Sequence, residues 1–220
     1  MKIDRHGQAK VLTQEEIQLL FTHGFLTPRD RALFGTCLYT AARIREVCLL
    51  RTSDVYSQSG QVKDVILFRK RETKGQLQSR SIFVIQELRS LLMDYYPNPV
   101  TWFVFPGRHG RSHIHPDSAA RILREACSEV GIEGVSTHSF RRTALTQMSN
   151  AGIPLRVIQK ISGHRNLEQL QVYLEVKPEQ ERGAVAALSM LSYVGKRMLD
   201  GVEAPVKQES EFSRTRQDVP

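Results

Sequence analysis

Apolar residues in about the first fifty positions recur at intervals of three and four, the spacing of one face of an α-helix. A first helix is expected after Thr13, because Thr13 and Glu16 have the spacing of a capping box. Pro28 is expected to open a second helix, since proline suits the first helical turn. A third helix is expected from about Arg43.

The pattern then changes to short runs of β-branched and aromatic residues, which are typical of strands. These runs occupy residues 65–68 and 81–85, and Val62 lies just before the first. A basic segment with Gly75 near its middle separates them, so the two runs predict an antiparallel hairpin. Residues 102–107 form a short apolar segment that a Pro-Gly pair closes.

Helical spacing returns after Pro116, with further starts expected near residues 137, 154, 166 and 178. Asp117 or Ser118 is expected to cap the first of these helices, and Thr137 or Ser139 the second. The whole pattern predicts a mainly α fold with a small antiparallel β-sheet, which is an α+β class.

The composition supports a folded chain. It has 220 residues, of which 40% are hydrophobic, enough for a core, so a wholly disordered protein is excluded. No apolar run is long enough for a membrane span, and the polar N-terminus lacks the apolar region of a secretory signal. We expect a single domain over residues 1–199 and a disordered tail over residues 200–220.

The charge balance changes the picture of possible partners. Lys and Arg number 31 against 23 Asp and Glu, a net charge of +8, which indicates a polyanion such as nucleic acid, although ordinary solubility charge is the alternative. The three cysteines, Cys37, Cys48 and Cys127, are odd in number and match no zinc spacing. They are expected to be buried free thiols in a reducing cytoplasm.

Four polar stretches carry side chains that suit phosphodiester chemistry. His138 and Arg141 are three residues apart near a helix start, where free N–H groups add to an anion site. Arginine forks bind a phosphodiester with two hydrogen bonds, and a tyrosine hydroxyl can be a covalent nucleophile. The set contains no carboxylate pair and no metal cage; its members are Arg43, Lys74, His138, Arg141, His164 and Tyr173.

This constellation resembles the tyrosine recombinase, or phage integrase, family. Residues 40–46, Thr-Ala-Ala-Arg-Ile-Arg-Glu, match the family's T-G-x-R-x-x-E box, and His138 and Arg141 match its H-x-x-R box. Residues 162–164, Ser-Gly-His, followed nine residues later by Tyr173, match its L-G-H box and tyrosine, and Lys74 matches its strand-borne lysine. The resemblance covers about residues 10–198.

The chain also departs from the family pattern. Ala41 replaces the usual glycine of the first box, and Arg142 stands where many relatives have histidine. Relatives usually carry an N-terminal helical domain that clamps DNA, whereas this sequence begins almost directly at the catalytic domain. A compact natural member and a fragment are both compatible with that beginning.

The resemblance implies a catalytic domain that breaks and rejoins DNA through a 3′-phosphotyrosine intermediate, without a metal, ATP or another cofactor. Tyr173 would attack the scissile phosphate, and Lys74 would protonate the leaving 5′-oxygen. The other expected roles are phosphate binding by Arg43 and Arg141, proton transfer at the tyrosine by His138, and donation to the phosphate by His164.

The resemblance also implies partners and a location. The implied partners are double-stranded DNA and further copies of the chain in a tetrameric synapse, with no membrane. The implied location is the cytoplasm, in association with the nucleoid. A type IB topoisomerase that nicks and reseals one duplex, and a DNA-binding regulator without strand exchange, are the alternatives.

Several of these residues have a second interpretation. Arg43 could be a surface arginine buttressed by Glu46, and Lys70 or Arg71 could take the place of Lys74 or only contact phosphates. His109, His113 and His115 are interpreted as part of a DNA-facing loop rather than as metal ligands. The expected phosphate contacts outside the site are Arg69, Lys70, Arg71, Arg80 and Arg142.

Overall fold

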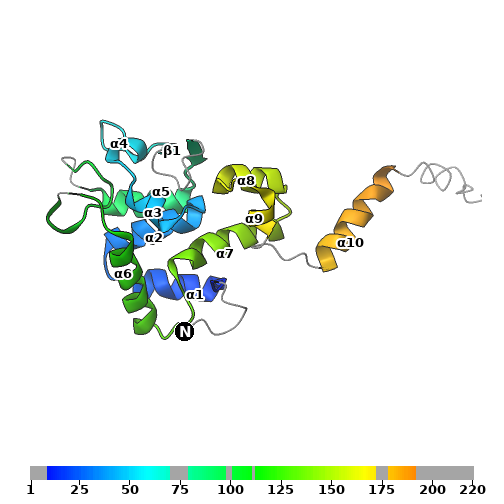
Figure 1. The fold of residues 1–220 in the computed structure, drawn as a ribbon, viewed down its shortest axis with the longest axis horizontal. Coiled ribbons are helices and arrows are strands. Elements are labelled where there is room, and N and C mark those ends of the chain that lie inside the picture. The colour runs from blue at the N-terminus through cyan, green and yellow to red at the C-terminus, as the bar shows by residue number, and fades with distance from the viewer. Residues whose placement is uncertain (1–8, 70–78, 98–100, 111, 172–177, 192–220) are drawn as a thin grey trace, which may run out of the picture. The chain divides into compact units, whose positions relative to one another are not determined.

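The computed structural model describes residues 9–69, 79–97, 101–110, 112–171 and 178–191 (Figure 1). The chain divides into two units, Met1–Glu175 and Val176–Pro220. The described part of the second unit consists of α10 (Pro178–Ala187) and the 3₁₀ turn η4 (Leu188–Leu191). The expected domain end at residue 199 and the expected tail over residues 200–220 lie outside the described residues.

Three helices of the first third begin where their sequence signals predict: α1 (Gln14–Leu19), α2 (Pro28–Thr40) and α3 (Ile44–Cys48). The capping box of α1 is present, with Thr13 Oγ1 accepting from Glu16 N at 3.2 Å and Glu16 Oε2 accepting from Thr13 N at 3.0 Å. Pro28 is the first residue of α2, so that prediction is also confirmed. The π-helical turn η1 (Leu20–Gly24) and the short helix α4 (Thr52–Val55) were not expected from the sequence.

The small antiparallel sheet is confirmed. β1 (Val65–Phe68) pairs with β2 (Arg80–Phe83), and Phe68 is the cross-strand partner of Arg80. The next segment, in which no element was expected, forms α5 (Gln86–Tyr95). α5 buries Leu88 and Leu92, whose spacing of four is itself a helical signal.

The helices of the second half begin close to the expected positions, but two caps differ. The N-cap of α6 (Pro116–Glu129) is His115, because Pro116 occupies the first helical position and the cap must precede it. The N-cap of α7 (Thr137–Asn150) is Ser136, whose side chain and backbone pair reciprocally with Ser139. The remaining elements are the 3₁₀ turn η3 (Arg108–Gly110), α8 (Leu155–Ser162), which follows Pro154 as expected, and α9 (Leu167–Gln171).

α2 organises the core of the larger unit. It packs against both α5 and α7, which are far from it in sequence (Figure 1). The Phe34 ring of α2 lies 4.7 Å from Phe25 and 5.3 Å from Phe140 of α7. Phe140 is fully buried, so its packing fixes the first turn of α7, including the neighbouring Arg141. The three cysteines are buried and unpaired, as expected.

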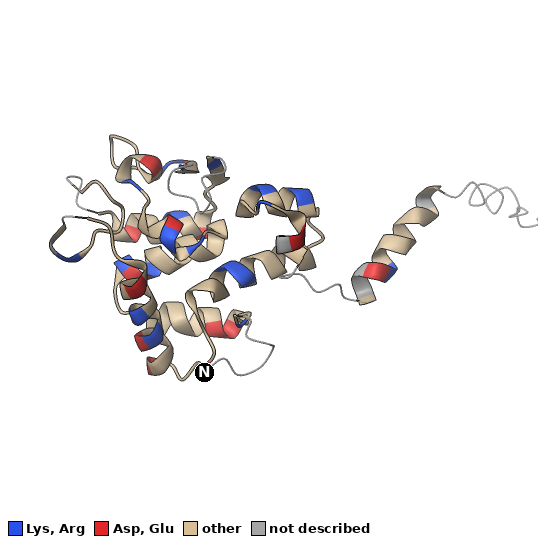
Figure 2. Cartoon of the chain, in the orientation of Figure 1, with Lys and Arg blue, Asp and Glu red and all other residues tan. Residues whose placement is uncertain are grey.

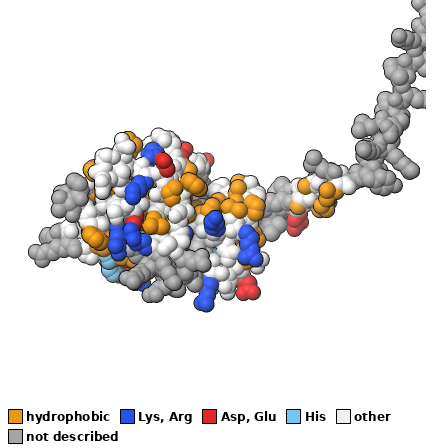
Figure 3. All heavy atoms as spheres, turned by 90° about the horizontal axis from the view of Figure 1, so that it is seen from above, with side chains coloured by type: hydrophobic (Ala, Val, Ile, Leu, Met, Phe, Trp, Pro, Cys, Tyr) orange, Lys and Arg blue, Asp and Glu red, His pale blue; other side chains and the backbone are white. Residues whose placement is uncertain are grey.

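Charged residues lie on several elements of the larger unit rather than on one (Figure 2). α3, α7 and α8 each carry basic residues (Figure 2). On the face seen from above, Lys and Arg side chains are interspersed with apolar and uncharged ones (Figure 3). Within the described part of the chain, no helix is both long enough and apolar enough to cross a membrane.

Candidate active site

Arg43 lies at the start of α3, where it is the N-cap residue. Its backbone N–H donates to Glu46 Oε2 at 2.9 Å, and its Nη1 donates to Glu46 Oε1 at 3.3 Å. The Arg43 side chain keeps 23% of its surface exposed, whereas that of Glu46 keeps 2%. Glu46 therefore buttresses Arg43 from the protein side and leaves part of its guanidinium open to a ligand.

The turn before Arg43 has an unusual backbone. Ala41 adopts the left-handed region, with φ 50° and ψ 26°, and is the one non-glycine residue with positive φ among those described. This conformation directs the Ala41 carbonyl toward α7, where it accepts a 2.5 Å hydrogen bond from Arg141 Nη1. The turn thus connects the two arginine-bearing segments directly.

Arg141 and His164 meet in the interior. Arg141 is 1% exposed, and its Nη2 lies 3.1 Å from His164 Nε2. His164 follows Gly163, which ends α8 in the left-handed conformation with φ 67°. On the other side of the ring, Ser162 Oγ lies 2.8 Å from His164 Nδ1. Since a guanidinium only donates, the consistent arrangement has Nε2 accepting from Arg141 and Nδ1–H donating to Ser162.

The electrostatics of the cluster favour an anion. Burial, then the charges of Arg141, Arg43 and Arg80, lower the pKa of His164 to about 3, so its ring is neutral. Burial raises the pKa of Glu46, but the hydrogen bonds and charges of Arg80 and Arg43 outweigh it and hold that pKa below its usual value. Three guanidinium groups and one carboxylate act on His164, which leaves an excess of positive charge that suits a phosphodiester.

The structure brings together three of the six expected site residues: Arg43, Arg141 and His164. His138 lies one turn before Arg141 on α7 and is exposed, so it is open to a substrate or to a neighbouring side chain. Lys74 and Tyr173 lie outside the described residues, as do Lys70 and Arg71.

Two of the expected phosphate contacts are placed differently. Arg142 is 3% exposed and donates from Nη1 to the Ala9 carbonyl at 2.6 Å. The Arg80 side chain is 8% exposed and pairs with Glu46. Each guanidinium is buried and bonded within the protein, so this structure does not present either one to a phosphate, and contact with DNA by these two residues stays a prediction.

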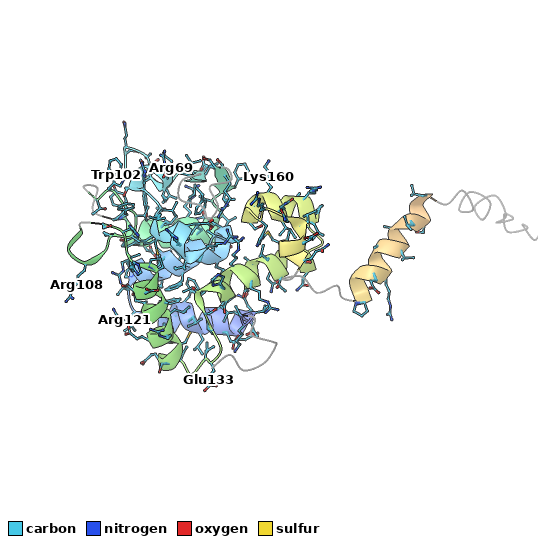
Figure 4. The ribbon with its side chains drawn as sticks, in the orientation of Figure 1. Arg69, Trp102, Arg108, Arg121, Glu133 and Lys160 are labelled. Carbon is cyan, nitrogen blue, oxygen red and sulfur yellow. The ribbon has the colours of Figure 1, made fainter. Side chains whose placement is uncertain are left out.

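Arg69 lies at the end of β1 (Figure 4) and is 40% exposed along its side chain. It donates two hydrogen bonds to the buried Asp54 carboxylate, from Nε to Oδ2 at 2.9 Å and from Nη2 to Oδ1 at 2.5 Å. Asp54 thus fixes the orientation of Arg69, while phosphate contact through its exposed part stays a prediction.

The histidine-rich loop has structural contacts of its own. His113 packs against Phe103, with ring centroids 5.3 Å apart, and His115 caps α6 by accepting from Asp117 N at 3.3 Å. No group of three or more His, Cys, Asp or Glu side chains among the described residues could hold a metal ion. The His109 side chain is outside that description.

Sequence reasoning missed two contributors to the site. Ser162 takes the place of leucine in the family's L-G-H box, and this substitution was a signal, because a hydroxyl there can orient the adjacent imidazole. Arg80 was assigned to phosphate because it lies in a basic hairpin; no local signal pairs it with Glu46, which is 34 positions away.

Comparison with known proteins agrees with this geometry. A model of the phage integrase family matches residues 10–180. A tyrosine recombinase from Thermosipho africanus is 28% identical over 163 residues, which are 73% of this chain and 54% of that protein. Tyrosine recombinase XerA from Pyrococcus furiosus is 29% identical over 190 residues, which are 83% of this chain and 63% of that protein. The chain thus spans somewhat more than half the length of these relatives.

Solved structures share the fold. The crystal structure of XerA recombinase superimposes with a TM-score of 0.65 at 22% identity, covering 85% of this chain and 66% of that one. XerH site-specific recombinase, in a pre-cleavage complex with its difH substrate, gives a TM-score of 0.62 at 19% identity, covering 80% and 53%. With a family model that matches most of the chain, and with its arginine and histidine boxes meeting in space, the chain belongs to the phage integrase family.

Proposed function

We propose that this protein is a site-specific DNA recombinase that breaks and rejoins strands through a 3′-phosphotyrosine intermediate. The observation that carries the proposal is the convergence of Arg43, Arg141 and the neutral His164 around one small region with excess positive charge. Such a cluster can surround the non-bridging oxygens of a single phosphodiester.

In the first step, the Tyr173 hydroxyl oxygen forms a bond to the scissile phosphorus, and the bond from phosphorus to the 5′-oxygen breaks. His138 takes part in moving the phenol proton, and Lys74 gives a proton to the leaving 5′-oxygen. Arg43 and Arg141 stabilise the charge that develops on the phosphate oxygens. His164 can donate to the same oxygens once Arg141 turns to the phosphate and Nε2 gains a proton, either by protonation of the ring or by a tautomer change in which Ser162 Oγ donates to Nδ1.

In the second step, a 5′-hydroxyl from a partner strand attacks the phosphotyrosine, and the tyrosine oxygen leaves. The number of phosphate ester bonds is unchanged, so the cycle needs no nucleotide. The guanidinium groups supply the positive charge that a metal supplies in other phosphoryl-transfer enzymes. Strand transfer independent of metal and ATP is therefore part of the proposal.

The proposed partner is double-stranded DNA, together with further copies of this chain. Exchange between two duplexes needs four cleavages, which is the basis for proposing a tetramer on DNA. A protein with this substrate would act at the nucleoid, in the cytoplasm. The relatives are named as recombinases, which favours strand exchange over simple nicking and resealing.

Trapping of a covalent complex tests the proposal. The full chain is incubated in EDTA with a pool of duplexes that have a randomised centre and a nick a few bases downstream of it. Cleavage then releases a short fragment that diffuses away, so the adduct accumulates and is seen on a denaturing gel. We expect an adduct with the wild-type chain and none with Tyr173→Phe, which removes one oxygen.

The enriched duplexes then distinguish strand exchange from its alternatives. Two intact copies of an enriched site on one plasmid should yield recombinant products. Relaxed plasmid without recombinants would indicate a topoisomerase, and binding without any adduct would indicate a regulator. An adduct that persists in Tyr173→Phe would contradict the assigned nucleophile.

A further inference from the structure

Arg80 is held from two sides at the start of β2. Its Nη2 donates to Glu46 Oε2 at 2.7 Å and its Nη1 donates to Glu46 Oε1 at 3.3 Å, a two-pronged pair with the carboxylate. Its guanidinium carbon lies 4.6 Å from the centre of the Phe68 ring, across the strand pair. These contacts leave the group little freedom to move toward a ligand.

Glu46 is shared between Arg80 and Arg43. Each carboxylate oxygen of Glu46 accepts from both residues: Oε2 from Arg43 N and Arg80 Nη2, and Oε1 from Arg43 Nη1 and Arg80 Nη1. A carboxylate that is 2% exposed needs full pairing. Without Arg80, the Glu46 carboxylate would pair more closely with the Arg43 guanidinium, which now contacts it through Nη1 at 3.3 Å, and would draw it away from a phosphate.

Arg80 also lies against the turn that carries His164. A Cβ placed on Gly163 would come within 2.8 Å of Arg80 Nη1. The positive φ of Gly163 favours glycine at this position, and any larger residue would also displace the Arg80 guanidinium. This is the C-terminus of α8, where a cation also interacts favourably with the helix dipole.

We propose that Arg80 is a positioning residue of the active site, which holds Arg43 through Glu46 and supports the Gly163–His164 turn without touching the phosphate itself. The inference rests on the proposed strand-cleavage function. The positioning role explains why this arginine is buried where β2, α3 and α8 meet. An arginine that only contacts DNA phosphates would lie on the surface.

Kinetics on an enriched duplex separate positioning from folding. The variants are Arg80→Gln and Arg80→Lys, with Arg121→Gln as the control, since Arg121 is an exposed arginine on α6 that pairs with Glu125 (Figure 4). At temperatures where all variants are folded by circular dichroism, we expect Arg80→Gln to slow adduct formation at saturating DNA about 10²-fold, the order of effect of an ångström-scale misplacement. Its Kd for DNA should stay within about threefold, since no phosphate contact is lost.

A double-mutant cycle tests whether Arg80 affects the cleavage rate through Arg43. If Arg80 acts through Arg43, Arg80→Gln should cost much less in an Arg43→Lys background than in the wild type, because coupled residues are not additive. Equal costs in both backgrounds, a wild-type cleavage rate in folded Arg80→Gln, or a salt slope of binding reduced by about one unit would each overturn the proposal.

A crystal structure of Arg80→Gln without DNA gives a readout that needs no activity. We expect both terminal guanidinium nitrogens of Arg43 to bind Glu46 and the turn at Gly163 to shift. Unchanged positions of Arg43 and His164 would overturn the proposal. If the wild-type chain forms no adduct, the proposed function fails, and this structure still decides the role of Arg80.

Discussion

The guanidinium of Arg141 and the imidazole of His164 are in donor–acceptor contact, 3.1 Å apart from Nη2 to Nε2. This contact requires a neutral ring, because a protonated imidazole has no free acceptor. The pKa of His164, lowered to about 3 by burial and then by Arg141, agrees with that state. A bound phosphate would compete for Arg141 and, being negative, would make a protonated His164 less costly.

Acid should destabilise the wild-type protein more than His164→Gln. With a folded-state pKa of about 3 and an unfolded value near 6.5, the unfolded chain binds the extra proton between these limits, so stability falls as pH drops below 6.5. The loss is about 1.4 kcal/mol per pH unit, or about 2 kcal/mol by pH 5. Urea unfolding of both proteins at pH 7.5 and pH 5 measures the difference.

The matched control for this titration is His23→Gln, which removes an exposed histidine from η1. Because this variant keeps the Arg141–His164 contact, it should show the same acid-dependent loss of stability as the wild-type protein. If wild type and His164→Gln lose stability in parallel, the neutral Arg141–His164 contact is not the state of the free protein.

Arg141→Lys should abolish most of the cleavage activity. Lysine retains the charge but cannot reach the Ala41 carbonyl, His164 and a phosphate with one planar fork. Loss of one donor to the transition state typically costs about 10²–10³ in rate. Single-turnover adduct formation measures the effect, with Arg121→Lys as the control, and a wild-type rate would show that Arg141 does not bind the reacting phosphate.

Ala41→Val should destabilise the fold by about 2 kcal/mol or more, because a β-branched residue tolerates positive φ poorly and Ala41 is 1% exposed. Ala41→Gly is the informative partner: relief of the left-handed backbone is offset by the lost methyl contact, so its stability should stay within about 1 kcal/mol of wild type. Urea unfolding checks both, and a stable Ala41→Val would contradict the strained turn.

Local signals were enough for most of the helices, for the small sheet and for part of the site, whereas α5 was missed. Capping residues and prolines marked the starts of α1, α2 and α8, and the arginine and histidine boxes named residues that meet in space. The sequence could not show which distant group a long side chain contacts in the folded protein. In the sequence Arg80 and Arg142 each look like a surface cation, yet their partners, Glu46 and the Ala9 carbonyl, are 34 and 133 positions away. Such pairings depend on the tertiary fold and have no local signature.

That difference between buried and surface cations gives a prediction about DNA affinity. Lys70 and Arg71 are expected from the sequence to contact phosphates, and each neutralised phosphate contributes about −0.9 to the log–log slope of affinity against salt. Lys70→Gln combined with Arg71→Gln should therefore flatten the slope by about two units. Arg142→Gln should weaken stability through loss of the bond to Ala9 but leave the slope unchanged, because its guanidinium is inside the protein. Fluorescence anisotropy with a labelled duplex over a salt series measures all three proteins, and a flatter slope in Arg142→Gln would show that this arginine reaches the backbone of DNA after all.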